Sequence, residues 1–129
     1  MGSRSAVKLS SRGLAIREAD VSRLLNDWLE VRGWTCRRTP SGLLHTAKGR
    51  MRVGEKGMAD WECTKPIRPG LVLHFYREDK ARGGRLSLEQ RLWADGMARR
   101  GYLVCCVPPS DDPLRWFIAW YNAHFVSGG

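Results

Sequence analysis

The sequence has no CxxC pair and no histidine at the spacing of a zinc site, although it contains four cysteines. It also has no apolar run of membrane length, no long basic amphipathic helix, no secretory signal and no internal repeat. These absences argue against a zinc module, a membrane protein and a repeat array. We therefore expect reduced core cysteines, no contact with a membrane and a cytoplasmic, intracellular location.

Acidic residues are few relative to basic ones. The chain has 22 Lys and Arg against 13 Asp and Glu, a formal charge of +9 and a pI near 10.0. Such a surplus attracts polyanions, and a phosphate backbone is the commonest one, although solubility alone is the alternative. Between Arg32 and Lys56 only Glu55 opposes the basic residues. This clustering favours DNA as the partner.

The length of 129 residues predicts one domain with its own core. Residues 1–13 are polar and basic and are expected to form a flexible N-terminal arm. A single domain is expected over 14–126, followed by a short tail over 127–129.

Hydrophobic periodicity and glycine or proline breaks predict the order of elements. In chain order we expect a helix over 14–32, a strand over 34–38, a long loop or irregular hairpin over 39–57, a strand over 59–64, a turn over 65–70, a strand over 71–79, a helix over 87–100, a strand over 102–107 and a helix over 113–125. The last strand must join the sheet across a helical crossover. The fold class is therefore α/β, with a mixed sheet between helices.

An apolar run over 71–76 ends in Glu78-Asp79-Lys80. Because side chains alternate along a strand, Glu78 and Lys80 should share one face while Asp79 points to the other. Buried charges are costly unless they are paired or bind a metal, and Asp60 lies on the preceding strand-like segment. The alternatives are an ion pair at a strand edge for Glu78 and Lys80, and a turn-capping role for Asp60.

Two helical residues extend this pattern. Glu18 is in step with the apolar positions Val21 and Leu25, so it should point inward, although it could also simply complement the helix dipole. Gln90 follows Ser87 at capping-box spacing, so its side chain should bond back to the Ser87 backbone amide and cap its helix.

These elements together resemble the virus-type replication-repair nuclease (VRR-NUC) domain of the PD-(D/E)XK nuclease superfamily. The residues that carry the resemblance, within about 14–108, are Glu18, Gly57-Met58-Ala59-Asp60, Glu78-Asp79-Lys80 and Gln90. The resemblance implies a restriction-endonuclease-like αβββαβ core with a mixed central sheet flanked by helices, plus a C-terminal helix. Arg77 stands where the family usually has an apolar residue, so we expect the end of that strand to be exposed.

The resemblance also implies a function: a Mg²⁺-dependent (or Mn²⁺-dependent) endonuclease that hydrolyses DNA phosphodiester bonds, with a structure-specific, Holliday-junction or flap preference and no small-molecule cofactor. Asp60, Glu78 and the Asp79 carbonyl would bind the metal, with Lys80, Glu18 and Gln90 assisting. Hard oxygen ligands of this kind suit such a cation. The alternatives are a non-catalytic DNA-binding module with the same fold, a restriction-like sequence-specific endonuclease and a structural subunit.

Two further groups are expected at the surface. Trp116 and Trp120 lie on a second face of the last helix and predict a homodimer interface, which the resemblance also implies, unless they simply cover the sheet edge. Arg82 and Arg85 flank two glycines and could grip phosphates, or could belong to an ordinary turn. The candidate DNA-binding residues are Arg37, Arg38, Lys48, Arg50, Arg52, Lys56, Arg82 and Arg85.

Overall fold

The computed structural model describes residues 17–40, 43–46, 49–52 and 54–126, and residues 43–46 and 49–52 as backbone only. The elements in chain order are α1 (Glu18–Val31), β1 (Thr35–Arg38), β2 (Leu43–Thr46), β3 (Gly49–Arg52), β4 (Trp61–Arg68), β5 (Leu71–Asp79), α2 (Leu88–Arg99), β6 (Val104–Val107), α3 (Pro113–Tyr121) and the π-helical turn η1 (Asn122–Val126).

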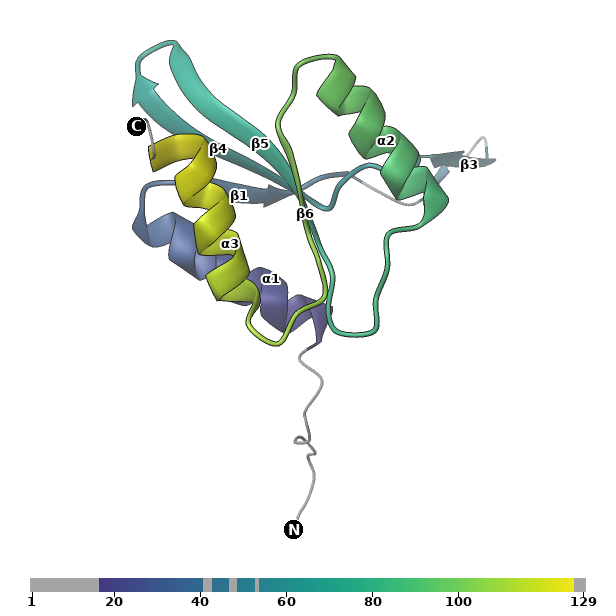
Figure 1. The fold of residues 1–129 in the computed structure, drawn as a ribbon. Coiled ribbons are helices and arrows are strands. Elements are labelled where there is room, and N and C mark those ends of the chain that lie inside the picture. Colours follow the sequence, from purple (N-terminus) through teal and green to yellow (C-terminus); the bar gives the residue numbers. More distant parts are fainter. Residues whose placement is uncertain (1–16, 41–42, 47–48, 53, 127–129) are drawn as a thin grey trace.

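The main sheet is mixed, as the sequence predicts. Its strand order is β1-β4-β5-β6, with antiparallel pairs except for β5 and β6, which are parallel. Helix α2 makes the crossover between these two strands (Figure 1). The β5–β6 register places Glu78 opposite Cys106, so the acidic end of β5 is held inside the sheet.

The two faces of β5 meet different helices, which makes this an α/β sheet between helical layers (Figure 1). Phe75 packs against Phe117 of α3 and Trp34 beyond α1, and it is fully buried. On the other face, Tyr76 meets Trp93 of α2, with ring centroids 5.0 Å apart. The core is thus concentrated on the α1 and α3 side. Its buried members are Val21, Leu25, Leu29, Trp34, Cys63, Phe75, Cys105, Val107, Phe117 and Tyr121.

Strand β4 is longer than predicted, and the expected turn over 65–70 is wrong for its first half. The strand continues through Pro66 to Arg68, and the chain reverses at Pro69 and Gly70. A proline is tolerated here because β1 pairs with β4 only as far as Thr64, which leaves one side of β4 without a neighbouring strand at Pro66. The register shift between Pro66 and Arg68 absorbs the missing N–H donor.

The remaining elements agree with the sequence apart from their boundaries. The segment over 39–57 contains the β2–β3 hairpin, as one of its two predicted forms. Asp112 caps α3 by accepting a hydrogen bond from the Arg115 amide, with Pro113 at the first helical position, as predicted. The α-helix ends at Tyr121 and η1 completes the predicted span. No helix among the described residues is long and apolar enough to span a bilayer.

Candidate metal centre

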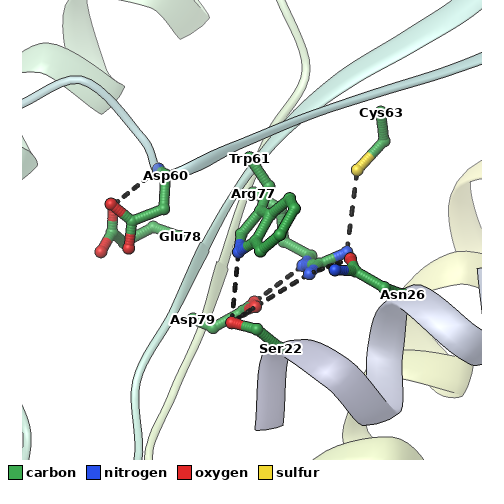
Figure 2. A network of polar contacts seen from close by, with 8 residues as sticks. All are labelled: Ser22, Asn26, Asp60, Trp61, Cys63, Arg77, Glu78 and Asp79. Carbon is green, nitrogen blue, oxygen red and sulfur yellow. Dashed lines mark hydrogen bonds and ion pairs between the residues drawn. The ribbon is translucent and has the colours of Figure 1, made fainter. Parts of the chain in front are cut away.

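Three carboxylates from separate parts of the chain meet at one place. Glu18, Asp60 and Glu78 each offer an oxygen that lies within 4.8 Å of the others' oxygens. They come from the first residue of α1, the residue before β4 and the end of β5, so the fold joins positions up to sixty residues apart in sequence. Figure 2 shows Asp60 and Glu78 side by side. The structure therefore brings together the three acids that the sequence singled out.

Gly57 sets the path of the chain into Asp60. Its φ is +78°, and an added Cβ would lie 2.3 Å from the backbone oxygen of Glu89 at the start of α2. Only glycine tolerates both the backbone conformation and this close approach. The Thr39 amide then donates to the Asp60 carbonyl at 2.8 Å. Gly57 thus allows the loop to lie against α2, and the loop then presents the Asp60 carboxylate to the cluster.

Glu78 lies at the centre of the cluster and is almost completely buried, with 2% of its surface exposed. Its Oε1 accepts a hydrogen bond from the Asp60 amide at 3.2 Å. Burial, followed by the negative charge of Asp60, raises the pKa of Glu78 to about 7, although the Lys80 ammonium opposes this rise. Without a cation, a large share of Glu78 is thus neutral near pH 7. A divalent cation would favour the charged form instead.

Gln90 forms the predicted capping box and also contacts the carboxylate cluster. Its side-chain oxygen Oε1 accepts a hydrogen bond from the Ser87 backbone amide at 2.9 Å. The Gln90 backbone amide donates in turn to Ser87 Oγ, which completes a capping box. Its Nε2 then donates to Glu78 Oε2 at 3.1 Å. Because the oxygen is engaged in the cap, the amide nitrogen faces the acid. The helix cap therefore orients a hydrogen-bond donor toward the carboxylate cluster.

Lys80 brings a positive charge to the same cluster. Its ammonium nitrogen lies 3.4 Å from Glu78 Oε2, and the side chain is 13% exposed. The two residues share one face of the strand, as alternation predicts, and the ion pair that was the alternative interpretation is also present. The Lys80 amide donates to the Val107 carbonyl at 3.1 Å, which ties the end of β5 to β6.

The Asp79 carboxylate lies away from the cluster, on the opposite face of β5. It accepts hydrogen bonds from Arg77 Nε and Nη2 at 2.8 and 2.9 Å, and from Ser22 Oγ at 2.8 Å. Its side chain is fully buried, so these partners use its acceptor capacity. Asp79 could therefore serve a metal only through its backbone carbonyl. That role stays a prediction.

Arg77 overturns one expectation from the sequence. The end of β5 was expected to be exposed at this residue, but Arg77 is 0% exposed. The expectation is wrong because the charge is paired with Asp79 two residues along the same face, and Nη2 also donates to Asn26 Oδ1 at 2.7 Å. The network links α1 to β5 immediately beside Glu78 (Figure 2).

The sequence contained a signal for this network. Arg77 and Asp79 alternate with Glu78, and Ser22 and Asn26 lie one turn apart on α1. A buried arginine on a strand requires an acid on the same face. The second acid of Glu78-Asp79-Lys80 is therefore the partner of Arg77 rather than a third acid at the cluster.

The candidate DNA-binding residues differ in how free their charges are. Lys56 forms an ion pair with Glu89 at 2.6 Å, and Arg82 forms one with Asp111 at 2.8 Å, so part of their charge is neutralised. Arg37, Arg38 and Arg85 are exposed. Lys48 lies outside the described residues, as do the side chains of Arg50 and Arg52. Among the candidates whose side chains are described, the exposed charges outside these two ion pairs thus lie on β1 and in the loop before α2.

The two tryptophans of α3 pack largely within their own chain. Trp120 stacks on Phe117 at 5.6 Å and on His124 at 4.5 Å, and its ring lies 5.1 Å from Phe75 of β5. Trp116 is also half-buried against the core. These contacts agree with the alternative that the rings cover the sheet. The homodimer interface stays a prediction.

The donor set fits a small hard dication. Mg²⁺ binds oxygens at about 2.0–2.1 Å, so two of its ligand atoms lie at most about 4.2 Å apart. The oxygens of the three acids lie within 4.8 Å of one another, so the carboxylates would have to move closer together to bind one such ion.

No protein-family model matches the sequence, and a search of curated proteins finds no relative.

Proposed function

We propose that the chain is a Mg²⁺- or Mn²⁺-dependent endonuclease that hydrolyses DNA phosphodiester bonds, with the restriction-endonuclease-like fold of the VRR-NUC domains. The observation that carries the proposal is the cluster of Glu18, Asp60 and Glu78 with the Lys80 ammonium beside it. Burial, and after it the negative charge of Asp60, raises the pKa of Glu78, so the charged form of the cluster is unfavourable without a cation. Its assembly at the end of a buried strand is best explained by a cation that compensates the charge.

Each residue has a role in this proposal. Asp60 and Glu78 would hold the ion, and the exposed Glu18 would complete the set directly or through water. When bound, the ion would neutralise the phosphate charge and lower the pKa of a water molecule. Lys80, whose nitrogen lies 3.4 Å from Glu78, would either orient the attacking water and help deprotonate it, or stabilise the negative charge that develops on the phosphate.

Gln90 would keep Glu78 oriented within this set. Its Nε2–H donates to one carboxylate oxygen while the Asp60 amide donates to the other, so the rotation of the carboxylate is fixed from both sides. A carboxylate held in this way needs little reorganisation when it binds its ligand. The exposed Arg37 and Arg85 would contact the flanking phosphates.

The DNA substrate would be branched or flapped. A two-fold dimer through Trp116 and Trp120 would present two copies of the site, which suits a four-way junction. A flap would instead be cut by a single copy. The proposed preference for these structures rests on the family resemblance.

The test is cleavage of labelled duplex, flap and four-way DNA by the purified chain, in Mg²⁺ and in EDTA. We expect cleavage only with the cation, and a loss of roughly a hundredfold or more in Asp60→Asn and Glu78→Gln. Asp111→Asn is the matched control, since Asp111 is 80% exposed and forms a surface ion pair with Arg82. Cleavage that persists in EDTA or in Asp60→Asn contradicts the proposal. Salt-sensitive binding without cleavage would identify a non-catalytic DNA-binding module.

A further inference from the structure

A half-open cavity of about 500 Å³ begins at the carboxylate cluster and follows α1 away from it. One face of the helix, from Glu18 to Glu30, forms one wall, and Arg38 and Trp61 form the other. Twelve residues of helix rise about 18 Å, so the cavity is elongated. Its volume is in the range of sites that bind small organic groups. Glu18 belongs to both the cavity and the metal centre, so a ligand in the cavity would lie next to the site of chemistry.

Trp61 supplies an aromatic wall whose position is fixed. Its indole N–H donates to Ser22 Oγ at 3.2 Å, and that hydroxyl donates in turn to the buried Asp79 carboxylate. The Arg38 guanidinium lies over the ring at 5.0 Å from its centroid, and the buried Arg77 guanidinium lies 5.5 Å from the same centroid (the ring is labelled in Figure 2). The Arg38 side chain is solvent-exposed, and an indole with an exposed guanidinium over it offers planar surfaces on which a base stacks.

Asn26 adds hydrogen-bond donors in a fixed orientation. Its Oδ1 accepts from the buried Arg77 Nη2 at 2.7 Å, which assigns the oxygen to the interior side of the amide. The two N–H groups of Nδ2 are therefore the part of the amide available to the cavity that Asn26 lines. The carboxylates of Asp27 and Glu30 provide acceptors on the same wall. The lining thus offers both donors and acceptors around an aromatic ring.

The charge of the lining selects against a phosphate. The lining contains three carboxylates and two guanidinium groups. The carboxylates belong to Glu18, Asp27 and Glu30, and the guanidinium groups to Arg23 and Arg38. A phosphate would gain more repulsion than attraction here, whereas a neutral ring with polar edges would find partners for its amino and carbonyl groups. Within DNA, only an unpaired base presents a free face and a free hydrogen-bonding edge together.

We propose that this cavity holds an unpaired nucleobase of the DNA strand that is cut, one or two nucleotides from the phosphate at the metal centre. The inference rests on the proposed nuclease function and specifies its substrate as DNA with single-stranded character at the cut. The base stacks against Trp61, and its edge meets the Asn26 amide and the acids of α1. A fully paired duplex lacks this contact.

The test measures binding of a fluorescein-labelled flap DNA to the full chain in EDTA, with single abasic residues placed in turn at each nucleotide flanking the junction. We expect one or two positions at which loss of the base raises Kd about tenfold. Ala19→Leu, which fills the cavity from an exposed helical position, should weaken binding of intact flap by a similar factor. Ala98→Leu, at an exposed position of α2, is the matched control and should bind like the unaltered chain.

Two results overturn the proposal: no abasic position changes Kd by more than twofold, or Ala19→Leu binds intact flap like the unaltered chain while remaining folded. The abasic series needs no variant, so a misfolded Ala19→Leu does not remove the test. Cleavage of the same DNAs in Mg²⁺ is measured in parallel. Base-dependent binding without cleavage defeats only the nuclease function, whereas cleavage with base-independent binding defeats only the cavity's role.

Discussion

The side-chain nitrogen of Gln90 donates to Glu78 Oε2 at 3.1 Å, while its side-chain oxygen accepts from the Ser87 amide in the cap of α2. One amide thereby connects the start of a helix to the most buried acid of the cluster. Glutamate also forms capping boxes at this helical position, but it cannot donate to Glu78. The two functions of Gln90 can therefore be separated by substitution.

Gln90→Glu should keep the capping box and disturb the cluster, whereas Gln90→Ala should lose the bond to Glu78 and the side-chain half of the box. We expect Gln90→Ala to lower the free energy of unfolding by about 1 kcal/mol, because the Ser87 amide loses its acceptor while the bond from the Gln90 backbone amide to Ser87 Oγ remains. Gln90→Glu should be destabilised mainly without a cation, because a further acid then faces Glu78. Urea denaturation with and without Mg²⁺ measures this difference. Equal responses of the two variants to Mg²⁺ would contradict the assigned geometry.

The buried pair of Arg77 and Asp79 should contribute far more to folding than an exposed pair of equal length. Asp79→Asn leaves the Arg77 charge buried without its partner, which should cost about 3–5 kcal/mol. Asp111→Asn breaks the Arg82 pair, which has the same 2.8 Å separation but is 63% and 80% exposed, and should cost about 0–1 kcal/mol. Thermal or urea unfolding of both variants gives the comparison. Similar losses would show that burial does not distinguish the pairs.

Gly57 should resist substitution more strongly than a glycine of the same backbone conformation elsewhere. Gly57 and Gly70 have φ of +78° and +83°, but an added Cβ meets the Glu89 backbone at Gly57 and nothing within 4 Å at Gly70. Gly70→Ala should cost about 1–2 kcal/mol, the penalty of the left-handed conformation. Gly57→Ala should cost more, because the loop must also move away from α2. Equal free energies of unfolding for the two variants would refute the close approach.

The raised pKa of Glu78 predicts how stability without metal depends on pH. Below pH 4.5, its ordinary pKa, the carboxyl is protonated in both the folded and the unfolded chain. Between 4.5 and about 7 the unfolded chain releases the proton first, so the free energy of unfolding falls, by about 3 kcal/mol in total. This contribution is thus present at low pH and is lost as the pH rises through the folded-state value.

Glu78→Gln should remove that part of the pH dependence. Urea unfolding in EDTA from about pH 4 to about pH 8, a range that includes the titration window, measures the free energy of unfolding of both proteins. Glu89→Gln, at an exposed acid, serves as the control. Identical pH profiles for the unaltered chain and Glu78→Gln would rule out the raised pKa. Mg²⁺ should reverse the trend above pH 7, because it binds the charged carboxylate.

Local patterns in the sequence predicted most of the fold and the acids of the site. The apolar run over 71–76 and the charged residues after it predicted β5 with its observed bounds, and the capping residues Ser87 and Asp112 located the starts of α2 and α3. Proline misled the prediction at Pro66, because whether a strand tolerates it depends on a neighbouring strand that is distant in the sequence.

The partners of charged residues were harder to predict for the same reason. Alternation along β5 placed Asp79 and Glu78 on opposite faces of the strand. It did not by itself predict the ion pair of Asp79 with Arg77 or the hydrogen bond from Ser22. Local signals show which face a residue takes, whereas the identity of its neighbours depends on how α1 packs across the sheet. For Gln90, the local sequence predicted the helix cap. Its hydrogen bond to Glu78 depends on how α2 packs against β5.

The hydrogen bond between Ser22 of α1 and Asp79 of β5 has a genetic consequence. Ser22 lies one helical turn after Glu18, and Asp79 directly follows Glu78, so one buried hydrogen bond aligns the segments that carry two of the three acids. A screen that scores only lost function should recover substitutions at Ser22 and Arg77 alongside those at the acids themselves. Neither side chain belongs to the carboxylate cluster, so such alleles would mimic substitutions of the three acids while acting through the alignment of α1 and β5.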